Sequence, residues 1–395
     1  MVSYLVRYLI IIGCLTALGL SARDFTVNII GGGDAIPGEY PWMVGIMDRN
    51  QSDNFQAQKC GGVLVHPYYV LTAAHCFDGQ TTESRDILVG TDSLISGGRR
   101  VSISSIVRHP GYSGGPTYEN DLALLRLSTP VADIEPIGIA DEAAWQAEGV
   151  VGRIIGWGLT REPSFYPDIL QEADMTILPF EEAKAAWGDF NISLIESMLP
   201  AGNPDGNPDT CFGDSGGPLL VRRSYDNAWV VAGITSYGDG CGTEDPPGIY
   251  TRVYSFRDYI YAILYPNFYS YANGYGQFSL GFDTDGDSLN LLQEYGYNMD
   301  PNNGRLAGGP VGSYMTIEGE TYATLSFNRR RNMREFAFRL EQGPLNGPWQ
   351  EVSLTTQTES QSTLDSKTEQ LTVRASLPID DAPFLRMTLI PTGQP

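Results

Sequence analysis

The chain has 395 residues, more than a single hydrophobic core usually organises, so two or more folded units are expected. It carries 25 lysines and arginines against 47 aspartates and glutamates, which gives a formal net charge of −22. A charge of that sign argues against nucleic acid as a partner. We interpret it as a solvated acidic surface, with adaptation to salty or calcium-rich surroundings as the alternative.

Residues 1–22 have the layout of a secretory signal peptide. Arg7 supplies the basic end, an apolar run follows from Tyr8 to Leu20, and small residues close the segment. The run is too short to span a membrane comfortably. The surroundings of Cys14 also resemble a bacterial lipoprotein signal, which would leave Cys14 as a lipidated terminus. We favour ordinary removal and therefore predict a secreted, extracellular protein.

Removal of that signal leaves four cysteines, an even number that indicates disulfide bonds in an exported chain. They are Cys60, Cys76, Cys211 and Cys241. Four cysteines allow three pairings, and their positions alone do not choose among them.

Two motifs in the first half of the chain offer a base and a carboxylate. Leu-Thr-Ala-Ala-His-Cys contains His75, and Glu-Asn-Asp-Leu-Ala-Leu-Leu places Asp121 at the head of an apolar strand. A lone aspartate before an apolar run is usually a turn or cap residue. Beside an imidazole, a buried carboxylate instead fixes the tautomer of the ring and stabilises its charged form.

The most informative motif is Asp-Thr-Cys-Phe-Gly-Asp-Ser-Gly-Gly-Pro, at residues 209–218. Ser215 is the candidate nucleophile. Because a serine hydroxyl is a poor nucleophile near neutral pH, it needs a neighbouring imidazole to take its proton. Gly213 lacks a Cβ, so the backbone can turn its own N–H and that of Ser215 towards one point. We expect an oxyanion hole here, in which one donor typically contributes about 2.7–4 kcal/mol to lowering the barrier.

The order His75, Asp121, Ser215 is that of the chymotrypsin-type serine proteases, and residues 29–266 closely resemble the trypsin branch of that family. The resemblance implies an all-β protease domain made of two six-stranded antiparallel β-barrels, with the triad between them and a helix at the C-terminal end. It also implies acyl transfer on protein or peptide substrates, with no cofactor for catalysis.

The same resemblance implies the disulfide pairings Cys60–Cys76 and Cys211–Cys241. The first would tether the end of the strand that carries His75, and closing a loop of that size is worth about 3 kcal/mol in the chain-entropy model. The second would clamp the two walls of the substrate pocket.

An activation step is implied at Ile29-Ile-Gly-Gly, which resembles the mature N-terminus of these enzymes and leaves residues 23–28 as a short propeptide. A cut after Asn28 would free the Ile29 amine to pair with Asp214. Removing one partner of such a buried ion pair costs about 3–5 kcal/mol. Relatives usually carry Arg or Lys before the cut, so Asn28 predicts that another protease activates this chain.

Specificity is implied by Asp209, which in the family fold lies at the bottom of the primary pocket. A carboxylate there matches a substrate Arg or Lys. Ser236 and Tyr237 resemble the strand on which the substrate backbone pairs, while Gly238 and Gly248 leave the pocket open to long side chains. We therefore expect cleavage after Arg or Lys.

Short segments in which apolar and polar residues alternate, broken by Gly and Pro, are typical of a β-barrel or a β-sandwich. They include Val63–Thr72, Val101–Arg108 and Val230–Tyr237. Helical spacing of apolar residues predicts a final helix that is capped by Ser255 and ends before Pro266. Residues 267–282, rich in Tyr, Gly and Asn, are interpreted as a linker.

Residues 283–304 contain an EF-hand-like calcium loop. Carboxylates at loop positions 1, 3, 5 and 12 and the carbonyl at position 7 are the predicted ligands of a structural Ca²⁺: Asp283, Asp285, Asp287, Glu294 and Leu289. Ser288 occupies position 6, where Gly normally allows the sharp turn. We expect a single calcium loop, and an unoccupied acidic turn is the alternative.

Residues 305–395 are predicted to form a β-sandwich accessory domain without a catalytic constellation. Alternating apolar and polar residues favour four half-buried strands, at Tyr322–Phe327, Glu335–Leu340, Gln370–Ala375 and Phe384–Ile390. We interpret the three arginines at 329–331 as a solvated turn.

Three functions are consistent with these sequence features. The first is a secreted trypsin-like endopeptidase with an accessory module. The second is a catalytically inactive binding protein on a protease fold, against which the retained triad, oxyanion glycine and activation terminus argue. The third is an adhesive or carbohydrate-binding role for the C-terminal module, in contact with glycans or a cell surface. We favour the first.

Overall fold

The computed structural model describes the chain in two stretches. The first covers residues 32–160 and 166–266, apart from 204–205, 207, 225 and 243–245. The second consists of residue 295 and of 311–391, with gaps at 318, 332, 334–335, 344–349, 353–357, 365–367 and 378–383. The expected signal peptide, propeptide, Ile29, linker and calcium ligands lie outside the described residues. None of the helices in these two stretches is long and apolar enough to cross a membrane.

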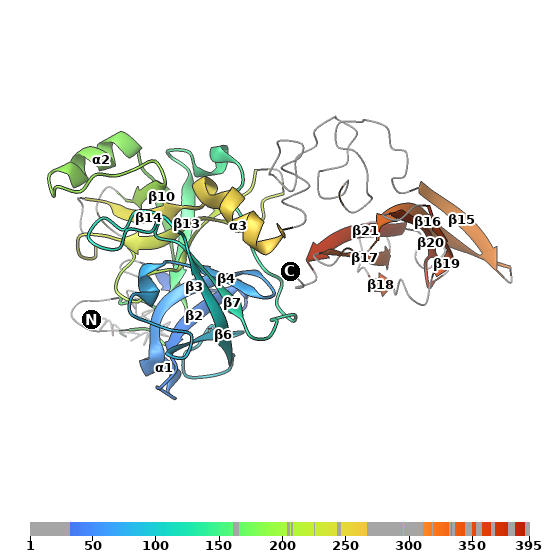
Figure 1. The fold of residues 1–395 in the computed structure, drawn as a ribbon, viewed down its shortest axis with the longest axis horizontal. Coiled ribbons are helices and arrows are strands. Elements are labelled where there is room, and N and C mark those ends of the chain that lie inside the picture. The colour runs from blue at the N-terminus through green and yellow to red at the C-terminus, as the bar shows by residue number, and fades with distance from the viewer. Residues whose placement is uncertain are drawn as a thin grey trace, which may run out of the picture.

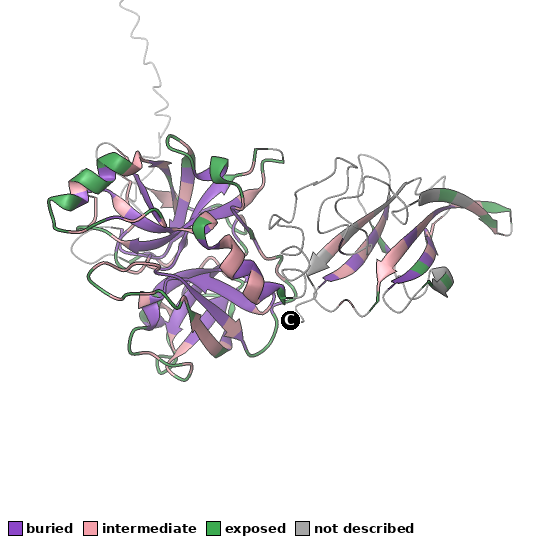
Figure 2. Ribbon diagram, turned by 45° about the horizontal axis from the view of Figure 1, so that its top comes forward, coloured by how far each residue is buried: buried purple, intermediate pink, exposed green. Residues whose placement is uncertain are grey.

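The first barrel is a closed antiparallel ring in the strand order β2-β3-β4-β7-β6-β5. Buried aliphatic side chains fill its interior, whereas exposed residues gather in the outer loops (Figure 2). Closure leaves no open strand edge, and this fixes the strand ends that carry functional residues. The bounds are β2 Met43–Asp48, β3 Gln58–His66, β4 Tyr69–Thr72, β5 Arg85–Val89, β6 Arg99–Arg108 and β7 Ala123–Leu127.

The second barrel closes in the same way, because β9 pairs with both β10 and β12 and completes the ring β9-β10-β11-β14-β13-β12. Two short strands, β1 Gly33–Asp34 and β8 Gly138–Ile139, pair on its outside with β10 and β13. The six barrel strands are β9 Val151–Gly156, β10 Gln171–Ile177, β11 Met198–Gly202, β12 Pro218–Arg222, β13 Trp229–Tyr237 and β14 Gly248–Arg252. The predicted pair of six-stranded barrels is confirmed.

Short helices occupy the connections between strands. They are α1 Asn54–Ala57, η1 His75–Phe77, η2 Ala143–Gln146, α2 Phe180–Gly188, η3 Val253–Phe256 and α3 Arg257–Leu264. The expected final helix is present as η3 followed by α3, but the expected cap is wrong. Ser255 lies inside η3, and α3 begins at Arg257 without any side-chain cap bond. Burial of Ile260 and Leu264 against the first barrel fixes this helix instead.

One expected strand is divided in the structure. Val63–Thr72 consists of the end of β3 and the whole of β4, with Pro67 in the turn between them. Proline lacks an N–H and cannot continue the hydrogen-bonded ladder. His66, the last residue of β3, is fully buried, and burial lowers the pKa of its imidazole to about 4.

The C-terminal region forms two antiparallel sheets that share one apolar core (Figure 1). The core residues come from both sheets: Phe327, Phe338, Leu340, Val352, Leu371 and Val373. One sheet has the order β15-β16-β20-β19 and the other β18-β17-β21. The strands are β15 Val311–Ile317, β16 Glu320–Arg330, β17 Phe336–Gly343, β18 Gln350–Val352, β19 Thr358–Thr363, β20 Thr368–Arg374 and β21 Phe384–Pro391.

The interpretation of residues 329–331 as a solvated turn is wrong for its first two arginines. Both lie at the end of β16, where Arg329 pairs with Glu369 of β20. Arg330 Nε donates to the Tyr295 carbonyl at 2.9 Å, and its guanidinium covers the Tyr295 ring. The arginine side chains therefore bridge segments of the C-terminal region.

An aromatic cluster joins the end of α3 to the C-terminal sheets. The Tyr265 ring lies 4.8 Å from Phe336 of β17 and 5.5 Å from the buried His66, between ring centroids. Tyr295 also contacts Phe336, edge-on, with ring centroids 6.2 Å apart. These contacts lie beside the first barrel, on elements that do not carry the candidate catalytic residues.

Candidate active site

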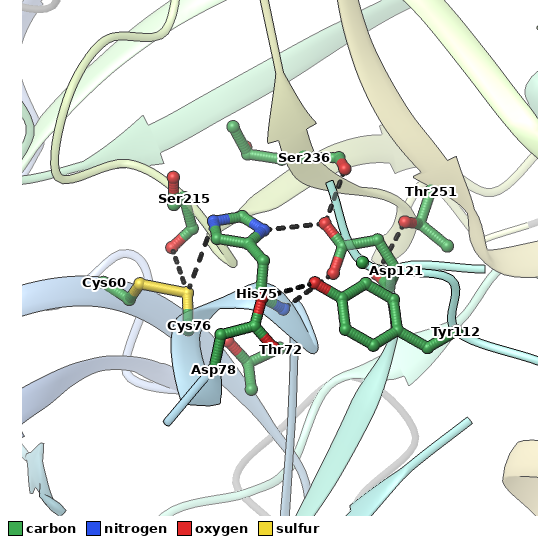
Figure 3. A network of polar contacts seen from close by, with 12 residues as sticks. Cys60, Thr72, His75, Cys76, Asp78, Tyr112, Asp121, Ser215, Ser236 and Thr251 are labelled. Atoms are coloured by element: carbon green, nitrogen blue, oxygen red, sulfur yellow. Dashed lines mark hydrogen bonds and ion pairs between the residues drawn. A yellow bond between two sulfur atoms is a disulfide. The ribbon is translucent and has the colours of Figure 1, made fainter. Parts of the chain in front are cut away.

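Three connections bring the candidate catalytic residues together (Figure 3). His75 begins η1 shortly after β4, Asp121 stands just before β7, and Ser215 lies in the loop that leads into β12. The first two belong to the first barrel and the third to the second barrel. The side chains therefore meet only because the two barrels pack against each other.

The Asp121 carboxylate is the best-anchored group of the site. It is only 1% exposed and accepts hydrogen bonds from His75 N at 2.9 Å, His75 Nδ1 at 2.7 Å and Ser236 Oγ at 2.6 Å. Thr251 Oγ1 also donates to its backbone carbonyl at 2.7 Å. Because Nδ1 carries the hydrogen that it donates, the neutral imidazole presents a lone pair at Nε2.

The Ser215 side chain lies on the Nε2 side of the imidazole, opposite Asp121 (Figure 3). The described contacts of Nε2 include Cys76 Sγ at 3.8 Å but no hydrogen bond to Ser215 Oγ. Such bonds are often long until a substrate closes the site. The arrangement gives a hydroxyl, a base with a free lone pair and a carboxylate that orients the base.

The backbone around Ser215 contains the two N–H groups that are expected to form the oxyanion hole, those of Gly213 and Ser215. Gly213 has φ +102°, a conformation that favours glycine. The Phe212 carbonyl accepts from Leu159 N at 2.8 Å, so the N–H of Gly213, on the opposite side of the same planar peptide, points away from Leu159. The Ser215 carbonyl accepts from Gly61 N at 2.8 Å. Among the described residues, neither the Gly213 nor the Ser215 N–H donates to a backbone acceptor.

Asp214, beside the nucleophile, is buried and faces away from the triad. Its carboxylate accepts from Gly158 N at 2.8 Å and Cys211 N at 3.0 Å, and burial raises its pKa to about 7. A Cβ at Gly156 or Gly158 would stand 2.0–2.3 Å from the carboxylate oxygens. No cation pairs with it among the described residues, and Ile29, its expected partner, lies outside them.

A cavity of about 300 Å³ opens beside Ser215 and contains every predicted pocket residue: Asp209, Ser236, Tyr237, Gly238 and Gly248. Asp209 Oδ2 accepts from Gly242 N at 2.8 Å. Burial raises the pKa of Asp209 to about 6, although backbone donors oppose the shift. A Cβ at Gly248 would stand 3.6 Å from Asp209 Oδ1, so this glycine keeps the carboxylate accessible.

A second cavity, of about 600 Å³, shares His75 and Ser215 with the first but not Asp209. Lys59, Arg85 and the exposed Phe212 are among its lining residues. Ser215 therefore stands between two cavities. A nucleophile in that position can attack a bond in the interior of a peptide, because each cavity can hold the chain on one side of that bond.

Sequence reasoning missed Tyr118, which lines the first cavity from the loop before Asp121. Its ring lies 5.6 Å from His75 and 5.7 Å from Tyr237, and Tyr237 in turn contacts Trp187 at 5.1 Å, between centroids. No local pattern marks Tyr118, because its role depends on a loop conformation with φ +46°.

Both disulfides that the resemblance implies are present. Cys60–Cys76 fixes η1 against β3, and Cys211–Cys241 joins the two walls of the first cavity. Among the described residues, the group closest to a metal-ligand arrangement is Cys60, His75 and Cys76. Because its two sulfurs are bonded to each other, it offers no thiolate.

Comparisons with known proteins agree with this geometry. Human serine protease 56 is 38% identical over 243 residues, which cover 59% of this chain and 38% of that protein. Ovochymase of Halocynthia roretzi is 30% identical over 249 residues, which cover 62% of this chain and 15% of that protein. This chain thus spans well under half the length of both relatives.

Among solved structures, mouse neuropsin, a serine protease expressed in the limbic system, is 29% identical with a TM-score of 0.51. The match covers 59% of this chain and 98% of the neuropsin chain. The family model for trypsin matches residues 29–260, more than half of the 395 residues. The chain therefore belongs to the trypsin family of serine proteases.

Proposed function

We propose that this chain is a secreted endopeptidase that cleaves peptide bonds after Arg or Lys by a Ser-His-Asp acyl-enzyme mechanism. The observation that carries the proposal is the Asp209 carboxylate, half-buried in a cavity that also contains Ser215 and His75. A long cationic side chain that reaches this carboxylate would leave its own carbonyl beside the candidate nucleophile.

In the proposed cycle, His75 Nε2 takes the hydroxyl proton as Ser215 Oγ attacks the carbonyl carbon. The N–H groups of Gly213 and Ser215 then hold the oxyanion of the tetrahedral intermediate. His75 returns the proton to the leaving amine, and an acyl ester remains on Ser215. Water then attacks the ester with His75 as its base, which releases the carboxylic acid and restores the hydroxyl.

Asp121 stabilises the imidazolium that forms twice in this cycle. Its two hydrogen bonds to His75, at 2.9 and 2.7 Å, hold the ring and its tautomer in one orientation. General base catalysis of this kind typically contributes about 10²- to 10⁴-fold to the rate.

The preference for Arg or Lys follows from the cost of a buried charge. Burial removes water from the Asp209 carboxylate, which destabilises its charged form and raises its pKa. A substrate guanidinium or ammonium compensates that charge, and the planar guanidinium can do so with two parallel hydrogen bonds. Apolar side chains of similar size would leave the carboxylate without a cation.

We further propose that cleavage after Asn28 activates the enzyme, by freeing the Ile29 amine to pair with Asp214. Support comes from the buried Asp214 carboxylate, whose pKa burial raises to about 7 and which pairs with no cation among the described residues. Because Asn28 replaces a basic residue, the purified precursor kept alone should retain its original N-terminus. Accumulation of an Ile29 terminus in N-terminal sequencing, without any added protease, would contradict dependence on a helper.

Hydrolysis of a small Arg p-nitroanilide by the processed protein separates the enzyme from an inactive protein of the same fold. We expect turnover that is competitively inhibited by benzamidine, a small planar amidinium cation that could pair with Asp209. Absence of turnover in protein with a sequenced Ile29 terminus would instead favour the binding-protein alternative.

For the C-terminal region we propose one bound Ca²⁺ and an accessory role in contact with glycans or a cell surface. The calcium proposal rests on the oxygen donors of the sequence at 283–294. We expect micromolar to millimolar Ca²⁺ to raise the thermal unfolding temperature of the full-length protein, and expect Asp285→Ala to abolish the rise. An identical Ca²⁺ response in wild type and Asp285→Ala would contradict binding at this loop.

A further inference from the structure

We propose that Gln58 is a positioning residue for the oxyanion hole, which acts by holding the Gly213 carbonyl from the opposite barrel. The inference rests on the proposed function, because an oxyanion hole matters only if Ser215 performs acyl transfer. Gln58 is not part of the triad or of the first cavity. It is the first residue of β3, in the first barrel.

The contact is direct and buried. Gln58 is 8% exposed, and its Nε2 donates to the Gly213 carbonyl at 2.8 Å and to the Cys60 carbonyl at 3.3 Å. Both neighbours are acceptors, which assigns the nitrogen rather than the oxygen of the amide to this side. The side chain thus presents both of its N–H groups to backbone oxygens.

Gly213 needs such a restraint because glycine has little conformational preference of its own. Two peptide planes meet at its Cα, and each plane is rigid. The plane towards Phe212 is fixed by the bond from Leu159 N to the Phe212 carbonyl, at 2.8 Å. The plane towards Asp214 is fixed by Gln58. With both planes held, φ and ψ of Gly213 are set and its N–H keeps one direction.

β3 therefore positions both proposed oxyanion donors. Gln58 holds the carbonyl of Gly213, and Gly61 N donates to the carbonyl of Ser215 at 2.8 Å. The close approach of β3 to the Ser215 loop favours glycine at residue 61, since a Cβ at Gly61 would stand 3.0 Å from Gly217 Cα. The Gly61 contact is made by the backbone, but the Gln58 contact is made by a side chain that a substitution can remove.

The test uses the full-length processed enzyme and Gln58→Leu, which replaces the amide with an apolar side chain of similar size that has no donor. Four quantities are measured: kcat and KM for an Arg p-nitroanilide, the inhibition constant of a peptidyl-Arg aldehyde, and the inhibition constant of benzamidine. The aldehyde forms a hemiacetal with Ser215 whose oxygen occupies the oxyanion hole. Benzamidine is expected to pair with Asp209 in the first cavity, and it has no carbonyl that could place an oxygen in that hole.

We expect Gln58→Leu to lower kcat by about 10- to 100-fold, a partial loss of one oxyanion donor. KM should change by less than about threefold. Aldehyde binding should weaken by about the same factor as kcat, while benzamidine binding should stay within about twofold. Gln342→Leu is the matched control, because Gln342 is also a buried, hydrogen-bonded glutamine but lies in the C-terminal sheets. It should leave all four quantities unchanged.

Two outcomes would overturn the inference: kcat and aldehyde binding within about twofold of wild type, or equal weakening of aldehyde and benzamidine, which indicates a general structural role. If thermal unfolding shows that Gln58→Leu does not fold, Gln58→Met provides an unbranched side chain of the same length. An inactive wild-type enzyme would refute the proposed function, whereas an active wild type with an unaffected Gln58→Leu would refute only the role of Gln58.

Discussion

Replacing Ser215 with alanine is expected to lower kcat for an Arg p-nitroanilide by about 10⁵- to 10⁶-fold, the scale seen when a triad serine is removed. The variant keeps His75, Asp121 and the Asp209 cavity but has no oxygen that can form the acyl ester. Residual hydrolysis should reflect only the oxyanion donors acting on bound substrate and water. The measurement is a steady-state rate for processed enzyme, with active-site titration of the wild type.

The matched control for that substitution is Ser128→Ala, because Ser128 is exposed and follows β7 on the first barrel. Its kcat should equal that of the wild type. Benzamidine should still bind to the Ser215→Ala protein, since the first cavity is intact. A Ser215→Ala enzyme that keeps a tenth of the wild-type rate would show that another group performs the chemistry.

Replacing Asp209 with serine is expected to lower kcat/KM for Arg substrates by about 10²- to 10⁴-fold. The estimate comes from the 3–5 kcal/mol that the loss of one partner of a buried ion pair costs, at 1.36 kcal/mol per factor of ten. The cavity would remain, so substrates with an apolar residue before the cut bond should gain relative to Arg. Kinetics with paired Arg and Leu substrates measure the change in preference.

Asp133→Ser is the control for this second prediction. Asp133 is an exposed aspartate that pairs with Arg99 on the first barrel, so its removal should leave the Arg-to-Leu ratio unchanged. An unchanged ratio in Asp209→Ser itself would mean that the Asp209 carboxylate does not select the substrate.

The same carboxylate sets a pH dependence whose sign follows from its raised pKa. Below about 6 the Asp209 carboxyl takes up a proton and no longer attracts a cation. The benzamidine association constant should therefore be constant well above this pKa and should fall by about tenfold per pH unit below it. Asp209→Ser should bind benzamidine weakly and without this dependence.

The parts of the site that could be predicted from the sequence are those that lie in continuous motifs. Ser215, Gly213, Asp214 and Asp209 fall within ten residues, so one loop that leads into β12 carries most of the chemistry. His75 is marked in the same way by its own motif. For these residues, local sequence already constrains backbone conformation and side-chain type.

Gln58 and Tyr118 could not be predicted, because their contacts arise only when distant segments pack. Gln58 and Gly213 are separated by 155 positions and meet across the two barrels. Tyr118 contacts His75 because Tyr118 itself adopts a positive φ, and no pattern in the sequence predicts that conformation. Single-residue identity carries no signal for either role.

The fold followed from the alternation of apolar and polar residues, but strand boundaries depended on local chemistry. Pro67 divides one expected strand into two, because it cannot donate to the ladder. In the C-terminal region, Arg329 extends β16 because Glu369 stands opposite it on β20, a pairing between strands that a charge pattern along one segment does not reveal.

The most direct measurement is the identification, by mass spectrometry, of the bonds that the processed wild-type enzyme cuts in an unfolded protein of known sequence. An anionic cavity floor beside the reactive hydroxyl predicts new C-termini that end almost entirely in Arg or Lys. Fragments that end in other residues with equal frequency, or an intact protein after long incubation, would contradict the account.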